Sequence, residues 1–257
     1  MKTSADVRLR KILRVLLAKP GPRLLAFDFD GTLVGFRDDP RAVELSRTQA
    51  ELLRKLASRF PVAILSGRSR ADLRKKFSGI PVRYLVGNHG LENGGAVGEK
   101  WKRDARTWAR AFRKELARRP EWRGVYLEDK RHSVSLHFRK VRDSRRVEAE
   151  LRKWAKSLRP APRVVPGFNV LNVVPARGDD KGRALRRLLK EQGYRSAFFA
   201  GDDVTDEDVF RLRNPRILTV RIGRPSVPTA ARYRLGRRGE LTRFLRLLLR
   251  ESTLDPP

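Results

Sequence analysis

Short apolar runs recur along the chain, and each is separated from the next by segments with a helical pattern. The runs are Leu24–Phe27, Val62–Leu65, Tyr84–Val86, Ala197–Ala200 and Leu218–Ile222. Apolar runs of this length are typical of parallel strands that are buried on both faces. Strands that alternate with helices indicate an α/β fold in which helices flank a parallel sheet.

Polar clusters follow four of these runs directly, at the point where each predicted strand ends. The clusters are Asp28 to Gly31, Ser66-Gly67, Gly87-Asn88-His89 and Gly201-Asp202-Asp203. In open α/β sheets, ligands bind at the carboxyl ends of the strands. The four clusters therefore predict one functional site at a single edge of the sheet.

The middle of the chain has a different pattern. It predicts a helix over 105–116, strands over 125–128 and 134–138, a helix over 145–158, and strands over 164–165 and 169–173. We interpret this block as an inserted α/β cap domain spanning residues 104–175. Residues 1–103 and 176–257 then form a discontinuous core domain. A short amphipathic helix packed on that core is expected near residues 12–18.

Two pairs of carboxylates stand at predicted strand ends. Asp28 and Asp30 project to the same side of a strand, so they would repel each other unless a cation lay between them. Mg²⁺ is such a cation, because it binds carboxylates and phosphate oxygens. Asp202 and Asp203 form the second pair. The alternatives are solvated turn carboxylates for the first pair and helix capping for the second; capping also suits the acidic residues at 206–208.

A lysine and a Ser-Gly turn suggest an anion site. Lys181 stands at the start of the helical pattern 182–191, where the helix dipole disfavours a cation. A bound phosphate would remove that penalty, although Asp179 and Asp180 could also neutralise the lysine. Ser66-Gly67-Arg68 follows a strand and precedes a helix, so its hydroxyl and free amides can bind an anion.

Composition excludes several classes of site. The 257 residues are 40% hydrophobic, which is enough for a buried core. The absence of cysteine excludes a disulfide framework, a thiol nucleophile and a cysteine-type zinc site. The three histidines are too scattered to suggest a zinc cluster. No apolar run approaches the ~20 residues of a membrane helix, so we expect a cytoplasmic protein without a membrane partner.

The net charge of +31 raises the question of nucleic acid. Its 60 lysines and arginines are spread over the whole chain, and we find no helix-turn-helix, zinc or aromatic RNA-binding signature. A basic nucleic-acid-binding protein remains an alternative, but we expect no specific nucleic-acid partner. The charge is better explained as a solvated surface that attracts anionic substrates. A monomer is the working hypothesis for the oligomeric state.

The strand-end motifs occur in an order that resembles a known superfamily. Asp28-Phe29-Asp30-Gly31-Thr32, Ser66-Gly67-Arg68, Lys181 and Gly201-Asp202-Asp203 resemble the four motifs of the haloacid dehalogenase superfamily of phosphatases. Asn88-His89-Gly90, 127–130, 137–139 and 201–207 resemble, more narrowly, the trehalose-6-phosphate phosphatases. The resemblance covers nearly the whole chain and implies a Rossmann-like core with a C2-type α/β cap.

The resemblance also implies a role for each site residue. Asp28 would be the nucleophile that forms an aspartyl-phosphate, and Asp30 the general acid and base. Mg²⁺ would be held by Asp28, the backbone carbonyl of Asp30, Asp202 and, through water, Asp203. Thr32, Ser66, Gly67 and Lys181 would bind the phosphoryl group. The residues expected to contact the rest of the substrate are Arg68, Asn88, His89, Glu128, Lys130 and Asn172.

One segment departs from the family pattern Gly-x-x-Val-x-Glu-x-Arg-Pro. Here Asn172 stands in place of the glutamate and Val174 in place of the arginine. A neutral amide forms weaker hydrogen bonds than a carboxylate does. The resemblance implies trehalose 6-phosphate as the substrate. The changes at Asn172 and Val174 leave three alternatives open, which are glucosyl-phosphoglycerate, mannosyl-phosphoglycerate and sucrose 6-phosphate.

Overall fold

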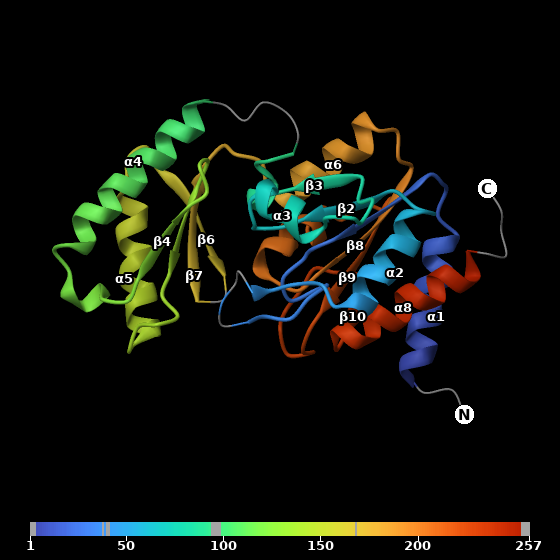
Figure 1. Ribbon diagram of the computed structural model, residues 1–257. Coiled ribbons are helices and arrows are strands. Elements are labelled where there is room, and N and C mark those ends of the chain that lie inside the picture. The colour runs from blue at the N-terminus through green and yellow to red at the C-terminus, as the bar shows by residue number, and fades with distance from the viewer. Residues whose placement is uncertain (1–3, 38, 40–41, 94–98, 168, 253–257) are drawn as a thin grey trace. The chain divides into compact units, whose positions relative to one another are not determined.

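A computed structural model describes residues 4–37, 39, 42–93, 99–167 and 169–252 (Figure 1). The chain divides into two compact units. Unit 1 comprises Met1–Asn93 and Asp180–Pro257, and unit 2 comprises Gly94–Asp179. Unit 2 is thus an insertion into the sequence of unit 1. Its role as a cap stays a prediction.

Unit 1 is built on a six-stranded sheet in the order β10-β9-β8-β1-β2-β3. All of its strand pairs are parallel, which confirms the predicted sheet. The strands are β1 (Arg23–Phe27), β2 (Val62–Leu65), β3 (Tyr84–Val86), β8 (Ser196–Gly201), β9 (Ile217–Ile222) and β10 (Tyr233–Leu235). The sequence pattern had not indicated β10, because three residues are too few to show a period.

Helices cover both faces of this sheet, and the side chains of β1 alternate between them. Leu25 and Phe27 join the core beneath α1 (Ser4–Leu17), α2 (Arg47–Ala57), α3 (Arg70–Lys76) and α8 (Arg238–Glu251). Leu24 and Ala26 join the core beneath α6 (Lys181–Glu191) and α7 (Glu207–Phe210). Burial on both faces is the reason that these strands read as continuous apolar runs.

Helix α1 is amphipathic, as the sequence predicted. Its apolar positions Leu9, Ile12, Leu13 and Leu16 are buried in the core shared with α8. Its four basic residues, at positions 8, 10, 11 and 14, are exposed. Among the described residues, no helix combines the length and the apolar character needed to cross a membrane.

Unit 2 has an antiparallel sheet in the order β4-β5-β7-β6. Its strands are β4 (Tyr126–Asp129), β5 (Val134–His137), β6 (Pro162–Gly167) and β7 (Val170–Pro175), and its long helices are α4 (Glu99–Leu116) and α5 (Ser144–Ser157). Alternate strand residues such as Leu136 and Leu171 pack with Trp108, Phe112 and Trp122 in a separate core. The predicted order of helices and strands is therefore confirmed.

The central strands of unit 1 place the candidate site. Strands β8, β1 and β2 are neighbours, and Phe27 is in register with Ile64 of β2 and Ala200 of β8. The strands all run in one direction, so the residues that follow them emerge at the same edge of the sheet. Asp28, Ser66 and Asp202 are these residues.

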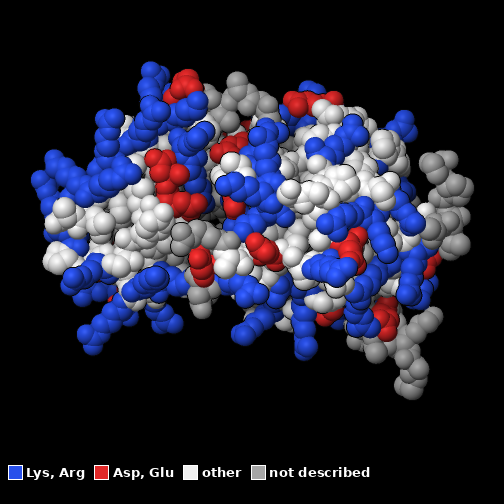
Figure 2. All heavy atoms as spheres, in the orientation of Figure 1, with Lys and Arg blue, Asp and Glu red and all other residues white. Residues whose placement is uncertain are grey.

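Basic side chains are widely distributed on the surface. Figure 2 shows lysines and arginines over elements of both units, with the acidic residues between them. The basic residues are thus spread over the whole viewed face, as they are spread along the whole sequence.

Candidate active site

Asp28 is a buried carboxylate. It follows β1 directly, its exposed fraction is 4%, and its backbone N–H donates to the carbonyl of Ala200 at 2.9 Å. Burial raises the pKa of Asp28 well above its usual range; Lys181 opposes this rise, while Asp206 and Asp202 add to it. The interpretation of Asp28 as a solvated turn residue is therefore wrong.

Lys181 connects the carboxylate of Asp28 to a second buried carboxylate, that of Asp206. It is the first residue of α6, and its Nζ donates to Asp28 Oδ1 at 2.7 Å and to Asp206 Oδ1 at 2.8 Å. Burial lowers the pKa of Lys181, but the attraction and hydrogen bonds of Asp206 and Asp28 outweigh burial, so the pKa rises. Asp180 instead caps the helix, since its carboxylate accepts the N–H of Arg183 at 2.7 Å.

Asp202 lies beside Asp28, at the end of β8. Thr32 Oγ1 donates to Asp202 Oδ1 at 2.6 Å. Burial, together with repulsion from Asp206, raises the pKa of Asp202 to about 7. Gly31 has φ +87°, and a Cβ atom there would lie 2.0 Å from Asp202 Oδ2, so this turn requires glycine.

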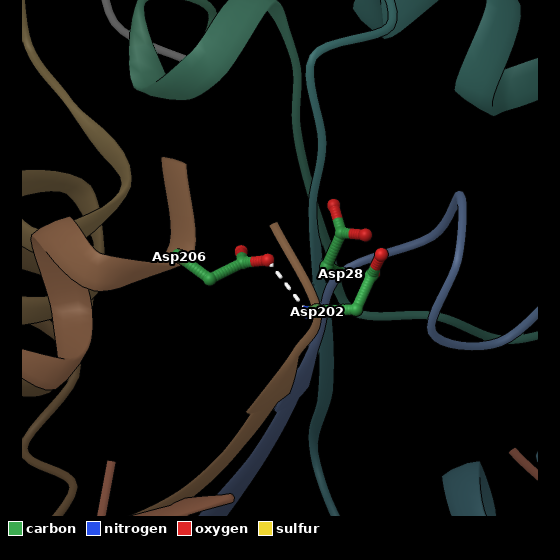
Figure 3. Close-up of side chains that lie close together, drawn as sticks. All are labelled: Asp28, Asp202 and Asp206. Atoms are coloured by element: carbon green, nitrogen blue, oxygen red, sulfur yellow. Dashed lines mark hydrogen bonds between the residues drawn. The ribbon is translucent and has the colours of Figure 1, made fainter. Parts of the chain in front are cut away.

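Asp206 is a site residue that the sequence reasoning missed. Its Oδ2 accepts the backbone N–H groups of Asp202 at 2.8 Å and Asp203 at 2.9 Å, while its Oδ1 accepts Lys181. Figure 3 shows its carboxylate directed toward the backbone of Asp202. Acidic residues in a first turn normally indicate capping, and Asp206 does form a capping box with Asp203. Its contact with Lys181 adds a second role.

The carboxylates of Asp28, Asp202 and Asp206 fit a divalent cation. One oxygen from each lies within 4.8 Å of the others, and Figure 3 shows Asp28 and Asp202 projecting side by side. Hard oxygen ligands of this kind suit Mg²⁺. The raised pKa values of Asp28 and Asp202 reflect buried negative charge, which a cation would offset.

Two further residues were predicted as metal ligands, Asp30 through its backbone carbonyl and Asp203 through water, and both assignments stay predictions. The carboxylate of Asp30 accepts hydrogen bonds from Arg68 at both oxygens, each at 2.7 Å. Arg68 also donates to Asp72 and lies over the ring of Phe29. The half-buried Asp203 has a raised pKa, chiefly because of burial, and does not belong to the three-carboxylate group.

The Ser66-Gly67-Arg68 turn is held by the short helix Asn88–Gly90. Asn88 N–H donates to the Arg68 carbonyl at 2.7 Å, and His89 N–H donates to the Ser66 carbonyl at 2.9 Å. Asn88 and His89 are buried and adopt positive φ angles of 53° and 58°, which are uncommon outside glycine. These two residues thus support the turn through their backbones, and their predicted contact with substrate stays a prediction.

The remaining predicted substrate residues lie in unit 2. Glu128 Oε2 is 2.8 Å from His137 Nε2 and 3.7 Å from Lys130 Nζ. Asn172 is buried: its Oδ1 accepts Ser135 Oγ at 2.6 Å, and its Nδ2 donates to the Val165 carbonyl at 3.3 Å. These contacts form a polar cluster on the sheet of unit 2.

Residues 26–237 match the family model described as trehalose-phosphatase. The chain belongs to the trehalose-phosphatase family. It is 34% identical to a trehalose-phosphate phosphatase of Mycobacterium tuberculosis over 202 residues, which cover 74% of this chain and 51% of that protein. The chain thus spans about half the length of its mycobacterial relatives. It is 30% identical to trehalose 6-phosphate phosphatase RA3 of Zea mays, covering 95% of this chain and 74% of that protein.

Solved structures of the family have the same fold. The C-terminal domain of a C. albicans trehalose-6-phosphate phosphatase matches with a TM-score of 0.76 at 23% identity, over 94% of this chain and 96% of that one. An Aspergillus fumigatus trehalose-6-phosphate phosphatase matches with a TM-score of 0.64 at 27% identity, over 95% and 97%. The predicted fold and the predicted resemblance to this family are therefore confirmed.

Proposed function

We propose that this chain is a Mg²⁺-dependent phosphatase that hydrolyses trehalose 6-phosphate through an aspartyl-phosphate on Asp28. The observation that carries the proposal is the cluster of buried Asp28, Lys181 and Asp206 with half-buried Asp202, at the strand ends of a trehalose-phosphatase family member. The family relatives named above supply the substrate class.

The first chemical step forms a bond between a carboxylate oxygen of Asp28 and phosphorus, and breaks the bond from phosphorus to the sugar oxygen. Lys181 holds Asp28 Oδ1 and supplies positive charge beside the transferring group. Thr32, Ser66 and Gly67 are proposed to bind the phosphoryl oxygens. When bound by Asp28, Asp202 and Asp206, Mg²⁺ would supply further positive charge against the phosphate.

Asp30 is proposed to give a proton to the leaving sugar oxygen. In the second step Asp30 takes a proton from the water that attacks phosphorus, which releases phosphate and restores the Asp28 carboxylate. Both oxygens of Asp30 accept hydrogen bonds from Arg68 in this structure. Its acid–base role therefore requires that one of these bonds be exchanged for the reacting oxygen.

A sister phosphatase acting on another sugar phosphate is the second candidate. It is favoured by Asn172, whose neutral amide is already bonded to Ser135 and Val165 within unit 2. The alternatives are glucosyl- or mannosyl-phosphoglycerate and sucrose 6-phosphate. Unit 2 is proposed to act as the cap that contacts the sugar, through Glu128, Lys130 and Asn172.

The test is phosphate release from trehalose 6-phosphate and from these alternatives, with Mg²⁺ and with a chelator. We expect Mg²⁺-dependent release selective for trehalose 6-phosphate, and loss of turnover in Asp28→Asn. The matched control is Asp143→Asn, which changes a helix N-cap of unit 2 and should retain turnover. Activity of Asp28→Asn within about tenfold of wild type would remove Asp28 as the nucleophile; release from a different sugar phosphate would move the specificity.

A further inference from the structure

Arg221 is a buried cation at the end of β9 that the proposed mechanism does not use. It is 6% exposed and stands in register with Gly201, the last residue of β8. Its Nη1 donates to Glu207 Oε1 at 3.2 Å and makes a long contact of 3.5 Å with the Asp203 carbonyl. The guanidinium of Arg221 thus extends from β9 to the turn that follows the neighbouring strand, β8.

The ion pair between Arg221 and Glu207 is poorly explained by stability alone. Both side chains are 7% exposed, and burying two charges costs several kcal/mol per ion. Arg221 Nε is buried without a hydrogen-bond partner among the described residues, which adds a cost of about 1–3 kcal/mol. Apolar residues of similar volume often serve stability as well as such a pair does.

The pair holds both ends of the turn that carries Asp206. Arg221 contacts Asp203 on one side of Asp206 and Glu207 on the other. Glu207 Oε2 also accepts the backbone N–H of Ala230 at 3.0 Å, which ties the turn to a second segment. Asp206 in turn fixes Lys181 and the amides of Asp202 and Asp203, so the position of this turn sets the geometry of the carboxylates.

The positive charge of Arg221 also helps to hold the carboxylates of the site together. Its Nη1 lies 3.5 Å from the Asp203 carbonyl, so a positive charge stands beside the turn that carries Asp202 and Asp206. Lys181 supplies a second positive charge, which pairs with Asp28 and Asp206. Arg221 therefore partly offsets the repulsion among the carboxylates from the β9 side.

We propose that Arg221 is a positioning residue for the divalent cation site: through Asp203 and Glu207 it holds the turn that presents Asp202 and Asp206. This inference rests on the proposed function, because it assumes that these carboxylates bind Mg²⁺. Loss of a partner behind the ligands of a metal site typically weakens metal binding by about 10–100-fold. We expect that range for Arg221→Met, with an unchanged KM for sugar phosphate at saturating Mg²⁺.

The experiment is titration of the full chain with Mg²⁺ in a calorimeter, without substrate, at a temperature where circular dichroism shows each variant folded. Arg221→Met should raise the dissociation constant about 10–100-fold, and Arg221→Lys should give an intermediate value because it keeps the charge. The matched control is Arg234→Met. Arg234 is in register with Arg221 on β10, but it donates to the carbonyls of Arg224 and Val227.

A double variant keeps the inference testable if Arg221→Met does not fold. Arg221→Met with Glu207→Gln leaves no unpaired buried charge, and the glutamine can still accept the N–H of Ala230. It should fold and still bind Mg²⁺ about 10–100-fold more weakly than wild type. A dissociation constant equal to that of Arg234→Met, in whichever variant folds, would overturn the inference and leave the proposed function intact. Failure of the wild-type chain to bind Mg²⁺ would overturn both.

Discussion

The ion pairs of Lys181 allow a quantitative prediction for Lys181→Met. The substitution leaves Asp28 and Asp206 facing each other in a buried site. At an effective dielectric constant of about 20, two charges 2.7 Å apart attract by about 6 kcal/mol. Desolvation offsets much of this gain, and removal of one partner from a buried pair costs about 3–5 kcal/mol. In a chain of this size, each kcal/mol lowers Tm by about 2–4 °C. The expected decrease in Tm is therefore about 6–20 °C.

The assay is thermal unfolding of the metal-free protein, followed by the same measurement in Mg²⁺. Lys190→Met is the matched control, because Lys190 is an exposed lysine in the last turn of the same helix, α6. Mg²⁺ should restore part of the lost stability, since a cation takes over neutralisation of the carboxylates. If Lys181→Met unfolds within about 2 °C of Lys190→Met in metal-free buffer, the buried pairs do not contribute as argued.

Three further predictions follow from the site geometry. Gly31→Ala should lower activity at least 100-fold, because the added Cβ would displace Asp202. Gly79→Ala is the control: Gly79 has φ +71° and open space around it, so this variant should lose only about 1 kcal/mol of unfolding free energy and no activity. Because folding raises the pKa of Asp202 to about 7, its contribution to metal-free stability is fully present below about pH 4 and is lost as pH rises through 7. The increase in Tm on adding Mg²⁺ should accordingly be larger at pH 8 than at pH 6, and an equal increase at both would contradict this. Arg68→Lys keeps a charge but loses the two-point contact with Asp30, so kcat should fall about tenfold or more; an unchanged kcat would show that the pair does not position Asp30.

The sequence predicted the sheet and the location of the site because both depend on short-range patterns. Continuous apolar runs mark strands buried on both faces, and polar residues that follow three adjacent strands must gather at one edge. Asp28 and Asp202 came together for this reason. Their burial and raised pKa values depend on packing around the site, which no local pattern specifies.

Other features of the site could not be predicted from local patterns. Asp206 satisfies the capping rule, so its sequence environment gave no reason to expect its contact with Lys181, which lies 25 residues away in the chain. The anomalous position of Lys181 was the available signal, since a buried cation requires acidic partners. The two-point contact between Arg68 and Asp30 likewise depends on how the turns after β1 and β2 approach each other.

The central claim is that phosphate passes through Asp28, and chemical trapping of the intermediate tests it most directly. The enzyme is mixed with trehalose 6-phosphate and Mg²⁺, stopped with acid within one turnover, and reduced with borohydride, which converts an acyl phosphate to an alcohol. Mass spectrometry of the peptides should then find homoserine at position 28, dependent on substrate. The account would be contradicted if phosphate is released rapidly while Asp28 stays unmodified in every sample. This holds whether the acyl phosphate is found at another carboxylate or at no carboxylate.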